Sequence, residues 1–532
     1  GGHNAGMAHV GVRELLTELS YPFEMAVKAG ALSLMTAYNE VDGIPCTANP
    51  FLTNQLLRDQ WGFSGFVVSD LYAIDGLMSQ RVAAGRDEAG ILALRSGVDS
   101  DLGGNCFSAD LVRACREGRL AEADIDRAVS RILRLKFKMG LFDNPYVKVK
   151  KAEKLIGTSG HREVAREVAR QSVVLLKNEN QLLPLSKEVK RVAVIGPNAD
   201  NVYNQLGDYT APQAPGSVIT VLEGIRQKLP GAEVRYVKGC AVRDTLDTSI
   251  GEACETAKNS DVVVVVLGGS SARDFETDFL ETGAAVANER KVSDMESGEG
   301  FDRIGLSLMG KQVELLKALY ATGRPVVLVM VQGRPLELNW AAEHIPAILT
   351  TWYPGGEGGR AIADVLFGDY NPAGRLPLSY PRHVGQLPVY YNHKSAERHD
   401  YVEGTAAPLY PFGFGLSYTT FVYEGIDVRV EGDSVRVSVD VKNVGGRAGD
   451  EVVQLYLRDE QASVVTPFMQ LKAFQRVHLT SGESRRVEFV LTEEHLRVLD
   501  TSLNWRVEPG WFTVMIGASS QDIRQRTRFR ID

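Results

Sequence analysis

The sequence is poor in cysteine, has no long apolar run and carries no strong excess of one charge. Its five cysteines are odd in number and scattered, at Cys46, Cys106, Cys115, Cys240 and Cys254. That pattern fits neither a disulfide framework nor the spacing of a metal site. No apolar run approaches the roughly 20 residues that a membrane helix needs. The formal net charge of −8 gives no sign of a nucleic-acid partner, so we expect neither a nucleic-acid nor a membrane protein.

Motifs of several enzyme classes are missing as well. The sequence contains no G-x-S-x-G nucleophile elbow and no H-E-x-x-H zinc motif. A glycine-rich stretch at residues 353–368, "YPGGEGGRAIADVLFG", lacks both the G-x-G-x-x-G spacing and the lysine of a P-loop. Two interpretations stay open for it. It is either a phosphate cradle of a nucleotide-binding protein or a helix start whose glycines allow close packing, and the second is favoured.

The rest of the composition is typical of a globular protein with several domains. Hydrophobic residues make up 44% of the chain and charged residues 24%, and 532 residues suggest three or four domains. Residues 1–150 alternate helical patterns with apolar runs at 31–39, 65–70 and 96–103, each of which ends in polar groups. This alternation predicts a parallel α/β domain.

Three further segments follow along the chain. Residues 160–385 predict a second, doubly wound α/β domain. Its predicted strands lie at residues 191–197, 234–239, 261–269, 325–333 and 347–355. Residues 386–417 are rich in Pro, Gly and Tyr and are interpreted as a linker. Residues 418–532 alternate apolar and polar positions strictly, which predicts an antiparallel β-sandwich.

Asp70 follows the apolar run "GFVV" in the stretch "GFVVSDL" at residues 65–71. Active sites of parallel α/β folds form at the carboxyl ends of the strands, so this carboxylate is well placed for catalysis. An equally simple interpretation, which spacing alone favours, is that Asp70 caps a helix in the following "LYAIDGLMSQ". Both interpretations stay open at this point.

Glu299 lies in the acidic stretch "DMESGEGFDR" with Asp294, Glu296 and Asp302. Such a run is usually a solvated loop or the acidic first turn of a helix. The alternative is a general acid that a loop delivers, since like-charged neighbours raise the pKa of a carboxyl group. Asp70 and Glu299 together would form the two-carboxylate arrangement of glycoside hydrolysis, in which one carboxylate attacks the anomeric carbon and the other protonates the leaving oxygen.

Long stretches of the chain resemble glycoside hydrolase family 3, the β-glucosidase and β-xylosidase family. The resemblance rests on "PFEMAVKAGALSLMTAYNEVDGIPCTANPFLTNQLLRDQWGFSGFVVSDLYAID", "RILRLKFKMGLFDNPYV", "SVVLLKNENQLLPL", "VAVIGPNAD", "SGEGFDR", "PAGRLPLSYPR" and "PLYPFGFGLSYTTF", which run in family order. It implies an α/β multidomain fold: a TIM-like barrel at residues 1–150, an α/β sandwich at 160–385 and a fibronectin type III-like domain at 418–532.

The resemblance also implies site residues. Asp70 matches the family's nucleophile, Glu299 matches its acid/base residue with Glu296 as the fallback, and Tyr38 matches a tyrosine that lines the sugar site. The alternative for Tyr38 is an aromatic that packs on the barrel rim.

Two candidate sugar contacts depart from the family pattern. His3 stands where many members have Arg, so we expect a weaker contact with a sugar hydroxyl. Leu71 follows the nucleophile where an aromatic is common, and Tyr72 comes one place later, which puts sugar stacking there in doubt.

The largest departure is length. A (β/α)₈ barrel takes about 250 residues, and residues 1–150 offer enough for about three strand–helix units. We therefore expect a partial, truncated barrel that a homodimer partner or an N-terminal fragment completes. The same partner would supply the sugar-clamping groups that this sequence lacks. Because a missing N-terminal segment would carry any signal peptide, the compartment stays open, with a periplasmic or secreted location favoured over the cytoplasm.

These features predict a retaining exo-acting β-glycosidase. A β-glucosidase that releases glucose from the non-reducing end of β-glucosides and cello-oligosaccharides is favoured, and such an activity would serve cellulose degradation. A β-xylosidase or a broad β-glucosidase/xylosidase is the alternative within the class, and a non-catalytic sugar-binding protein is the alternative outside it. The two-carboxylate mechanism needs no metal or organic cofactor.

Overall fold

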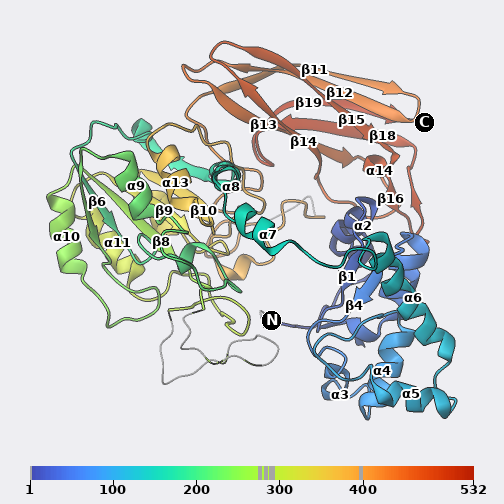
Figure 1. The fold of residues 1–532 in the computed structure, drawn as a ribbon. Coiled ribbons are helices and arrows are strands. Elements are labelled where there is room, and N and C mark those ends of the chain that lie inside the picture. The colour runs from blue at the N-terminus through green and yellow to red at the C-terminus, as the bar shows by residue number, and fades with distance from the viewer. Residues whose placement is uncertain (1–2, 274–277, 279, 281–285, 287–293, 395–398) are drawn as a thin grey trace. The chain divides into compact units, whose positions relative to one another are not determined.

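A computed structural model describes residues 3–273, 278, 280, 286, 294–394 and 399–532. The described residues form two compact units, the first built mainly from residues up to 155 and the second mainly from residues 156 onward (Figure 1). Each unit is treated by itself below. Among the described residues, no helix combines the length and the apolar composition that crossing a membrane requires.

The first unit is built around a pair of parallel strands. Strand β1 (Ser33–Met35) pairs with β4 (Phe66–Val68), with Leu34 opposite Val67. A small hairpin joins β2 (Glu40–Val41) to β3 (Ile44–Pro45). The helices of this unit are α1 (Val12–Glu14), α2 (Tyr21–Lys28), α3 (Gly76–Ser79), α4 (Arg86–Arg95), α5 (Ala109–Arg116), α6 (Glu122–Lys138) and α7 (Val149–Leu155). Two π-helical segments span Leu15–Leu19 and Phe51–Gln60, and a 3₁₀ turn spans Cys46–Ala48.

The third strand predicted in this unit, at residues 96–103, is wrong. The segment forms no regular strand, and it meets β4 at a single bridge between Ser100 and Val68. The reason lies in Asp99, whose carboxylate accepts the Val67 N–H at 2.9 Å while its own N–H donates to the Val67 carbonyl at 2.7 Å. A side chain thus takes the place of a main-chain carbonyl in the ladder. Arg58 and Arg131 pair with the same buried carboxylate at 2.7 and 2.8 Å and hold it there.

The second unit contains a six-stranded mixed sheet in the order β5-β10-β9-β8-β6-β7. Its strands are β5 (Val174–Asn178), β6 (Arg191–Ile195), β7 (Glu233–Val237), β8 (Val262–Gly268), β9 (Val326–Val331) and β10 (Ala347–Trp352). All five predicted strands are present and parallel, and β5 is an additional antiparallel edge strand. The strand order reverses beside β6, which makes the carboxyl ends of β6 and β8 the topological switch point of the sheet.

Helices cover both faces of this sheet because alternate strand residues point to opposite sides. Helices α10 (Ile250–Lys258), α11 (Gln312–Tyr320) and α12 (Asn339–His344) pack on the face that carries Ala193 and Ile195. Helices α9 (Val221–Lys228) and α13 (Gly358–Leu366) pack on the face that carries Val192 and Val194 (Figure 1). Helix α8 (Ser159–Ser172) packs beside α13, and 3₁₀ turns span Glu179–Gln181, Tyr203–Gln205 and Val384–Gln386.

The second unit also contains the predicted β-sandwich. One sheet has the order β11-β12-β15 and the other β14-β13-β18-β19 (Figure 1). The strands are β11 (Phe421–Glu431), β12 (Ser434–Asn443), β13 (Gly449–Asp459), β14 (Gln470–Leu479), β15 (Ser484–Thr492), β16 (Val498–Leu499), β17 (Trp505–Arg506), β18 (Gly510–Gly517) and β19 (Ile523–Ile531), with α14 at Glu493–Leu496. Inward-facing Val, Leu and Phe side chains of both sheets form one core.

The described residues of segment 386–417 are irregular but packed. Tyr391 stacks on Phe412 with ring centroids 4.0 Å apart, and its hydroxyl accepts the Leu471 N–H of β14 at 3.0 Å. Gln454 of β13 donates to the Gly413 carbonyl at 3.0 Å. The segment therefore contacts the sandwich through Tyr391 and Gly413.

Candidate active site

Asp70 lies two residues beyond β4, at the carboxyl end of the parallel pair. The intervening Ser69 is fully buried, its N–H donates to the Ser100 carbonyl at 2.9 Å, and its Oγ accepts the Leu102 N–H at 3.0 Å. Asp70 itself is half-buried, and its Oδ1 accepts the N–H of Leu71 at 2.7 Å. It does not cap a helix, because α3 starts only at Gly76. The strand end therefore presents this carboxylate to its surroundings.

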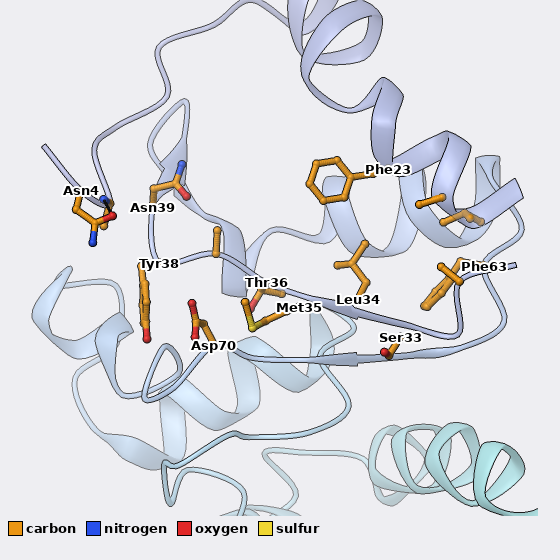
Figure 2. A pocket seen from close by; sticks show the side chains of 15 residues that line it. Asn4, Phe23, Ser33, Leu34, Met35, Thr36, Tyr38, Asn39, Phe63 and Asp70 are labelled. Atoms are coloured by element: carbon orange, nitrogen blue, oxygen red, sulfur yellow. Dashed lines mark hydrogen bonds between the residues drawn. The ribbon is translucent and has the colours of Figure 1, made fainter. Parts of the chain in front are cut away.

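A cavity of about 570 Å³ opens at this point of the first unit. Its lining residues come from the start of the chain, from α2, from β1 and the turn after it, and from the segment before and after β4: Asn4, Ala5, Phe23, Ala26, Val27, Ala31, Ser33, Leu34, Met35, Thr36, Ala37, Tyr38, Asn39, Phe63 and Asp70. Figure 2 shows Tyr38 beside Asp70 at one end of the cavity and the apolar side chains at the other.

Tyr38 is fixed against the loop that follows Asp70. Its hydroxyl donates to the Leu71 carbonyl at 2.8 Å, and its own carbonyl accepts from Gln80 Nε2 at 2.8 Å. The ring thus forms a wall of the cavity next to the carboxylate. This position suits both interpretations of Tyr38, as a sugar-lining residue and as a rim aromatic.

His3 and Tyr72 are not among the described residues that line the cavity. His3 is exposed near the start of the described chain. Tyr72 has a φ of +57°, is half-buried and donates its N–H to the Leu102 carbonyl at 2.9 Å. Of the four candidates in this unit, the structure brings together Asp70 and Tyr38 and leaves the other two outside the lining.

The sequence does not single out four other polar lining residues, Asn4, Ser33, Thr36 and Asn39, of which the two asparagines lie at the Asp70 end of the cavity (Figure 2). Asn39 follows Tyr38 directly at the end of the same strand segment, and Asn4 lies in the "GGHNAG" start. The rule that polar groups gather at strand ends, which singled out Asp70, would also have pointed to Asn39 at the end of the apolar run 31–39. No comparable signal marks Asn4, which reaches the cavity from outside any regular element.

Glu299 belongs to the second unit, in a loop at the carboxyl edge of the mixed sheet. The Glu296 N–H at the start of this loop donates at 2.8 Å to the carbonyl of Ser270, just after β8. The loop therefore lies at the switch point of the sheet, where α/β folds bind ligands. Glu299 is half-buried and donates its N–H to Asp208 Oδ2 at 3.3 Å.

Glu296 differs sharply from Glu299 in exposure. Its side chain is 2% exposed, and its Oε2 pairs with Arg303 Nη1 at 2.6 Å. Its Oε1 is buried with no hydrogen-bond partner among the described atoms. A carboxylate enclosed in this way contacts solvent far less than Glu299 does, so Glu299 is the better-placed proton donor of the two. Residues 287–293, directly before this stretch, lie outside the described residues.

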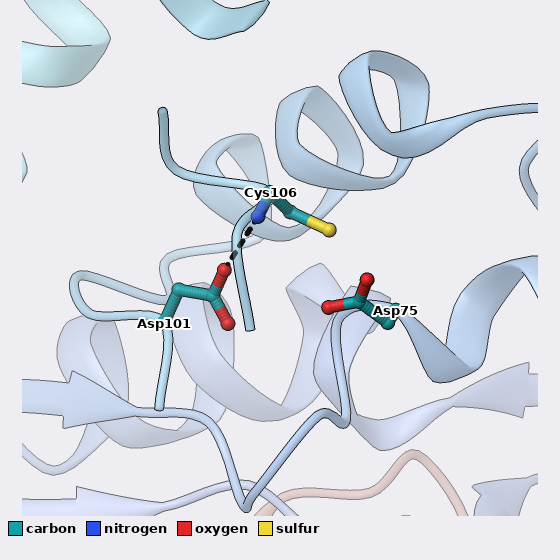
Figure 3. Close-up of side chains that lie close together, drawn as sticks. All are labelled: Asp75, Asp101 and Cys106. Carbon is teal, nitrogen blue, oxygen red and sulfur yellow. Dashed lines mark hydrogen bonds between the residues drawn. The ribbon is translucent and has the colours of Figure 1, made fainter. Parts of the chain in front are cut away.

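A second carboxylate cluster lies close to the Asp70 loop, formed by Asp75, Asp101 and Cys106 (Figure 3). One candidate ligand atom from each lies within 4.8 Å of the others. Burial, aided by the charge of Asp75, raises the pKa of the Cys106 thiol to about 12. A thiol that stays protonated is a poor metal ligand. Asp101 Oδ2 already accepts the N–H groups of Cys106 and Phe107 at 2.8 and 3.3 Å, so we interpret the cluster as a loop anchor.

Family models match most of the chain. The glycosyl hydrolase family 3 N-terminal domain matches residues 1–135, the glycosyl hydrolase family 3 C-terminal domain matches residues 173–418, and the fibronectin type III-like domain matches residues 451–520. These matches confirm the predicted fold class.

Relatives of known name agree with the models. A "Beta-xylosidase" of Formosa agariphila is 40% identical over 98% of this chain and 72% of its own length. A "Periplasmic beta-glucosidase" of Salmonella typhimurium is 36% identical over 99% and 71%. Among solved structures, a β-glucosidase from Erythrobacter marinus matches with a TM-score of 0.90 and 39% identity over all of this chain and 72% of its own. A mutant β-glucosidase from Listeria innocua in complex with laminaribiose matches with a TM-score of 0.89 and 33% identity, over all of this chain and 72% of its own.

Proposed function

Because the chain belongs to glycoside hydrolase family 3 and is a glycoside hydrolase, we propose that it is a retaining exo-acting β-glucosidase. It removes glucose from the non-reducing end of β-glucosides and cello-oligosaccharides. The observation that carries the proposal is Asp70, a carboxylate at a strand end that lines a cavity together with Tyr38.

The two carboxylates divide the reaction between them. Asp70 attacks the anomeric carbon and forms a covalent glycosyl-enzyme, while Glu299 protonates the departing oxygen. Glu299 then removes a proton from the water that releases the sugar. The half-buried state of both side chains supports these roles, since each has to contact substrate. The chemistry needs no metal or organic cofactor.

A nucleophile test decides the role of Asp70. We expect Asp70→Ala to lower turnover of an aryl β-glucoside by at least about 10³-fold, because the covalent intermediate cannot form. A fluoro-sugar that traps the intermediate is expected to label the peptide that contains Asp70, as mass spectrometry would show. Asp59→Ala, which removes an exposed carboxylate of the same unit, is the matched control and keeps full activity. Labelling of another carboxylate, with Asp70→Ala still active, would contradict the assignment.

A β-xylosidase is the second candidate, favoured by the relative from Formosa agariphila. Comparing kcat/KM for aryl β-glucoside and aryl β-xyloside separates the two, and comparable values would indicate a broad β-glucosidase/xylosidase. Sugar binding without turnover of either substrate would instead indicate a non-catalytic sugar-binding protein.

The proposal includes a partner for the first unit. Helix α6 carries an apolar stripe on its exposed side, formed by Val129, Leu133 and Phe137, which are 46%, 39% and 65% exposed. Among the described strands, β1 pairs only with β4, so its other edge carries main-chain groups outside any ladder. Apolar stripes and strand edges of this kind are normally covered. A homodimer, or an N-terminal fragment of the same fold, would cover both.

The proposal also places the protein in the periplasm or outside the cell. The Salmonella typhimurium relative, whose name includes "Periplasmic", supports this location. Expression from the complete gene, followed by osmotic-shock fractionation, tests it, and activity confined to the cytoplasmic fraction would refute it.

A further inference from the structure

The main chain around Glu299 has few conformational restrictions of its own, because glycine stands on both sides of it. Gly298 and Gly300 flank the residue with φ values of +127° and +83°. Glycine has the widest choice of backbone conformations, so a residue between two glycines is held only by what surrounds it. A general acid has to sit within hydrogen-bond reach of the oxygen that it protonates. The contacts that fix this short segment therefore bear directly on its chemistry.

Asp208 makes such a contact. It lies in the loop after the Tyr203–Gln205 turn, and its Oδ2 accepts the Glu299 N–H at 3.3 Å. A Cβ added at Gly298 would lie 3.0 Å from the same oxygen. The carboxylate thus packs directly against the peptide that joins Gly298 to Glu299. Any other residue at position 298 would crowd it, which gives the glycine a packing role in addition to its positive φ.

Asp208 is itself held in place by Arg273. The Arg273 Nε donates to Asp208 Oδ1 at 2.8 Å, and the guanidinium lies 4.2 Å from the ring centroid of Tyr209. The side chains of Asp208 and Arg273 are 16% and 19% exposed, so solvent screens the pair only partly. The Tyr209 N–H donates to the same Oδ1 at 2.7 Å. Two donors therefore orient one carboxylate, and its other oxygen accepts the Glu299 N–H.

The start of the loop is anchored separately. Arg243 Nη1 donates to the Met295 carbonyl at 2.8 Å, and the Arg243 N–H donates to Asp294 Oδ1 at 3.1 Å. The Glu296–Arg303 pair lies between this anchor and the end of the loop. These contacts fix the loop as a whole, whereas Asp208 contacts the residue that carries the proton. This difference allows the two kinds of anchor to be told apart by experiment.

We propose that Asp208, oriented by Arg273, is a positioning residue that sets the placement of Glu299 as general acid. The inference rests on the proposed acid/base role of Glu299. It assigns no proton transfer to Asp208. The hydrogen bond from the Glu299 N–H determines where the Glu299 carboxyl group is presented to the leaving oxygen.

The leaving group of the substrate provides the test. We expect Asp208→Ala to lower kcat for cellobiose by about 10- to 100-fold, since a displacement near 1 Å costs a catalytic group that much. With a dinitrophenyl β-glucoside, whose leaving group needs no proton, the loss in the first step is expected to stay below about threefold. Asp208→Asn keeps an acceptor oxygen and is expected to restore most of the cellobiose activity. Equal losses on both substrates, or an Asn variant as poor as the Ala variant, would overturn the proposal.

Asp261 offers a matched control in the same unit. Its carboxylate also accepts a main-chain N–H, from Arg191 at 2.9 Å, and also pairs with a guanidinium, that of Arg191 at 3.1 Å. It lies just before β8, at the opposite end of the strand from the Glu299 loop. Asp261→Ala is expected to leave the ratio of the two activities unchanged. A change as large as that of Asp208→Ala would show that the ratio reports general destabilisation.

A double variant separates this proposal from the one on which it rests. If Asp208 acts through Glu299, the double variant Asp208→Ala/Glu299→Ala loses no more cellobiose activity than Glu299→Ala alone. Amide hydrogen exchange of the peptide around residues 295–303 adds a readout independent of turnover. We expect faster exchange there in Asp208→Ala but not in the control Asp261→Ala. If Glu299→Ala shows no leaving-group dependence, the acid/base assignment fails. If Glu299→Ala shows leaving-group dependence but amide exchange of residues 295–303 is unchanged in Asp208→Ala, the acid/base assignment stands and the positioning role of Asp208 is wrong.

Discussion

Asp101 carries a buried oxygen, Oδ1, that has no hydrogen-bond partner among the described atoms, and the same holds for Oδ2 of the neighbouring Asp75. A Cβ added at Gly104 would lie 2.6 Å from the first oxygen and 2.4 Å from the second. The two carboxylates therefore face one another with little room between them. Burial, aided by the charge of Asp75, raises the pKa of Asp101.

A raised pKa makes the charged form of Asp101 a cost to the fold. The folded state binds the proton more tightly than the unfolded state, so protonated Asp101 stabilises the fold at low pH. This contribution is lost as the pH rises from the pKa of an unfolded aspartate to the raised pKa of Asp101 in the folded state. Asp101→Asn avoids the charge and lets an amide N–H donate to Asp75. We expect the variant to be more stable at pH 7 by about 1 kcal/mol in urea unfolding, with the gain vanishing near pH 3. A loss of stability at pH 7 would contradict this account.

Glu299 and Glu296 give a second prediction at the scale of single residues. Glu299→Ala is expected to cripple cellobiose hydrolysis but to spare the first step with an activated aryl glucoside, and added azide is expected to rescue it as a glycosyl azide. Glu296→Ala leaves Arg303 without its buried partner and is expected to lower stability by about 3 kcal/mol, without azide rescue. Product analysis and thermal unfolding check both. Azide rescue of Glu296→Ala instead would reverse the two roles.

Single residues also show where sequence reasoning ends. Asp70 could be placed at a strand end because the apolar run Phe66–Val68 ends two residues before it. The burial of Glu296 could not be foreseen, because its pairing with Arg303 depends on how the loop folds back on itself. Tyr72 has a positive φ and is not among the residues that line the cavity, and its residue type predicts neither.

At the scale of elements, the crossing of α9 and α13 explains the glycine-rich stretch at residues 353–368. A Cβ added at Gly359 would lie 1.9 Å from the Thr220 carbonyl oxygen, and one added at Gly224 would lie 2.0 Å from the Gly359 carbonyl oxygen. The two helices therefore meet backbone to backbone. This geometry supports the packing interpretation of the stretch over the phosphate cradle.

Substituting these glycines gives a prediction for the element. Gly359→Ala forces the helices apart and is expected to destabilise the second unit by at least about 2 kcal/mol. Gly356→Ala is the matched control, because the nearest atom to an added Cβ there is the Ser217 carbonyl oxygen at 3.5 Å. Thermal unfolding of both variants decides the matter, and equal midpoints would refute the packing role. If the unchanged protein binds a nucleotide in a titration and Gly359→Ala does not, the phosphate-cradle interpretation is supported instead.

The elements differ in how well the sequence predicts them. The parallel strands of the second unit were predicted because continuous runs of Val, Ile and Leu mark strands that are buried on both faces. The edge strand β5 was missed as a strand, although its sequence is apolar, because nothing in its pattern sets it apart from the end of α8. For segment 96–103 the error is the opposite, because a strand was predicted and none forms. The Asp99 side chain accepts the Val67 N–H in place of a main-chain carbonyl.

At the scale of the whole molecule, the apolar stripe of α6 predicts an assembly. We expect sedimentation at twice the 58.2 kDa mass of the chain, or, for a partner made of a separate N-terminal fragment, activity only after that fragment is added. Phe137→Asp places a charge in the stripe and is expected to weaken the assembly. Trp511→Asp, at a side chain 48% exposed in the sandwich, is the control. A fully active monomer at low concentration would show that the first unit needs no partner.

The contacts that Arg375 and segment 386–417 make with the sandwich bear on the evolution and engineering of this protein. Arg375 donates to the buried Glu451 of β13 at 2.8 Å, and the Phe468 N–H donates to the His393 carbonyl at 2.9 Å. The sandwich is thus not an interchangeable module that can be cut off at residue 418 and grafted elsewhere. A deletion there removes Glu451 and leaves the Arg375 guanidinium, whose side chain is 9% exposed, without this partner. It also exposes the aromatic pair of Tyr391 and Phe412. Any exchange of the sandwich between relatives has to move the preceding segment with it, as one inherited piece.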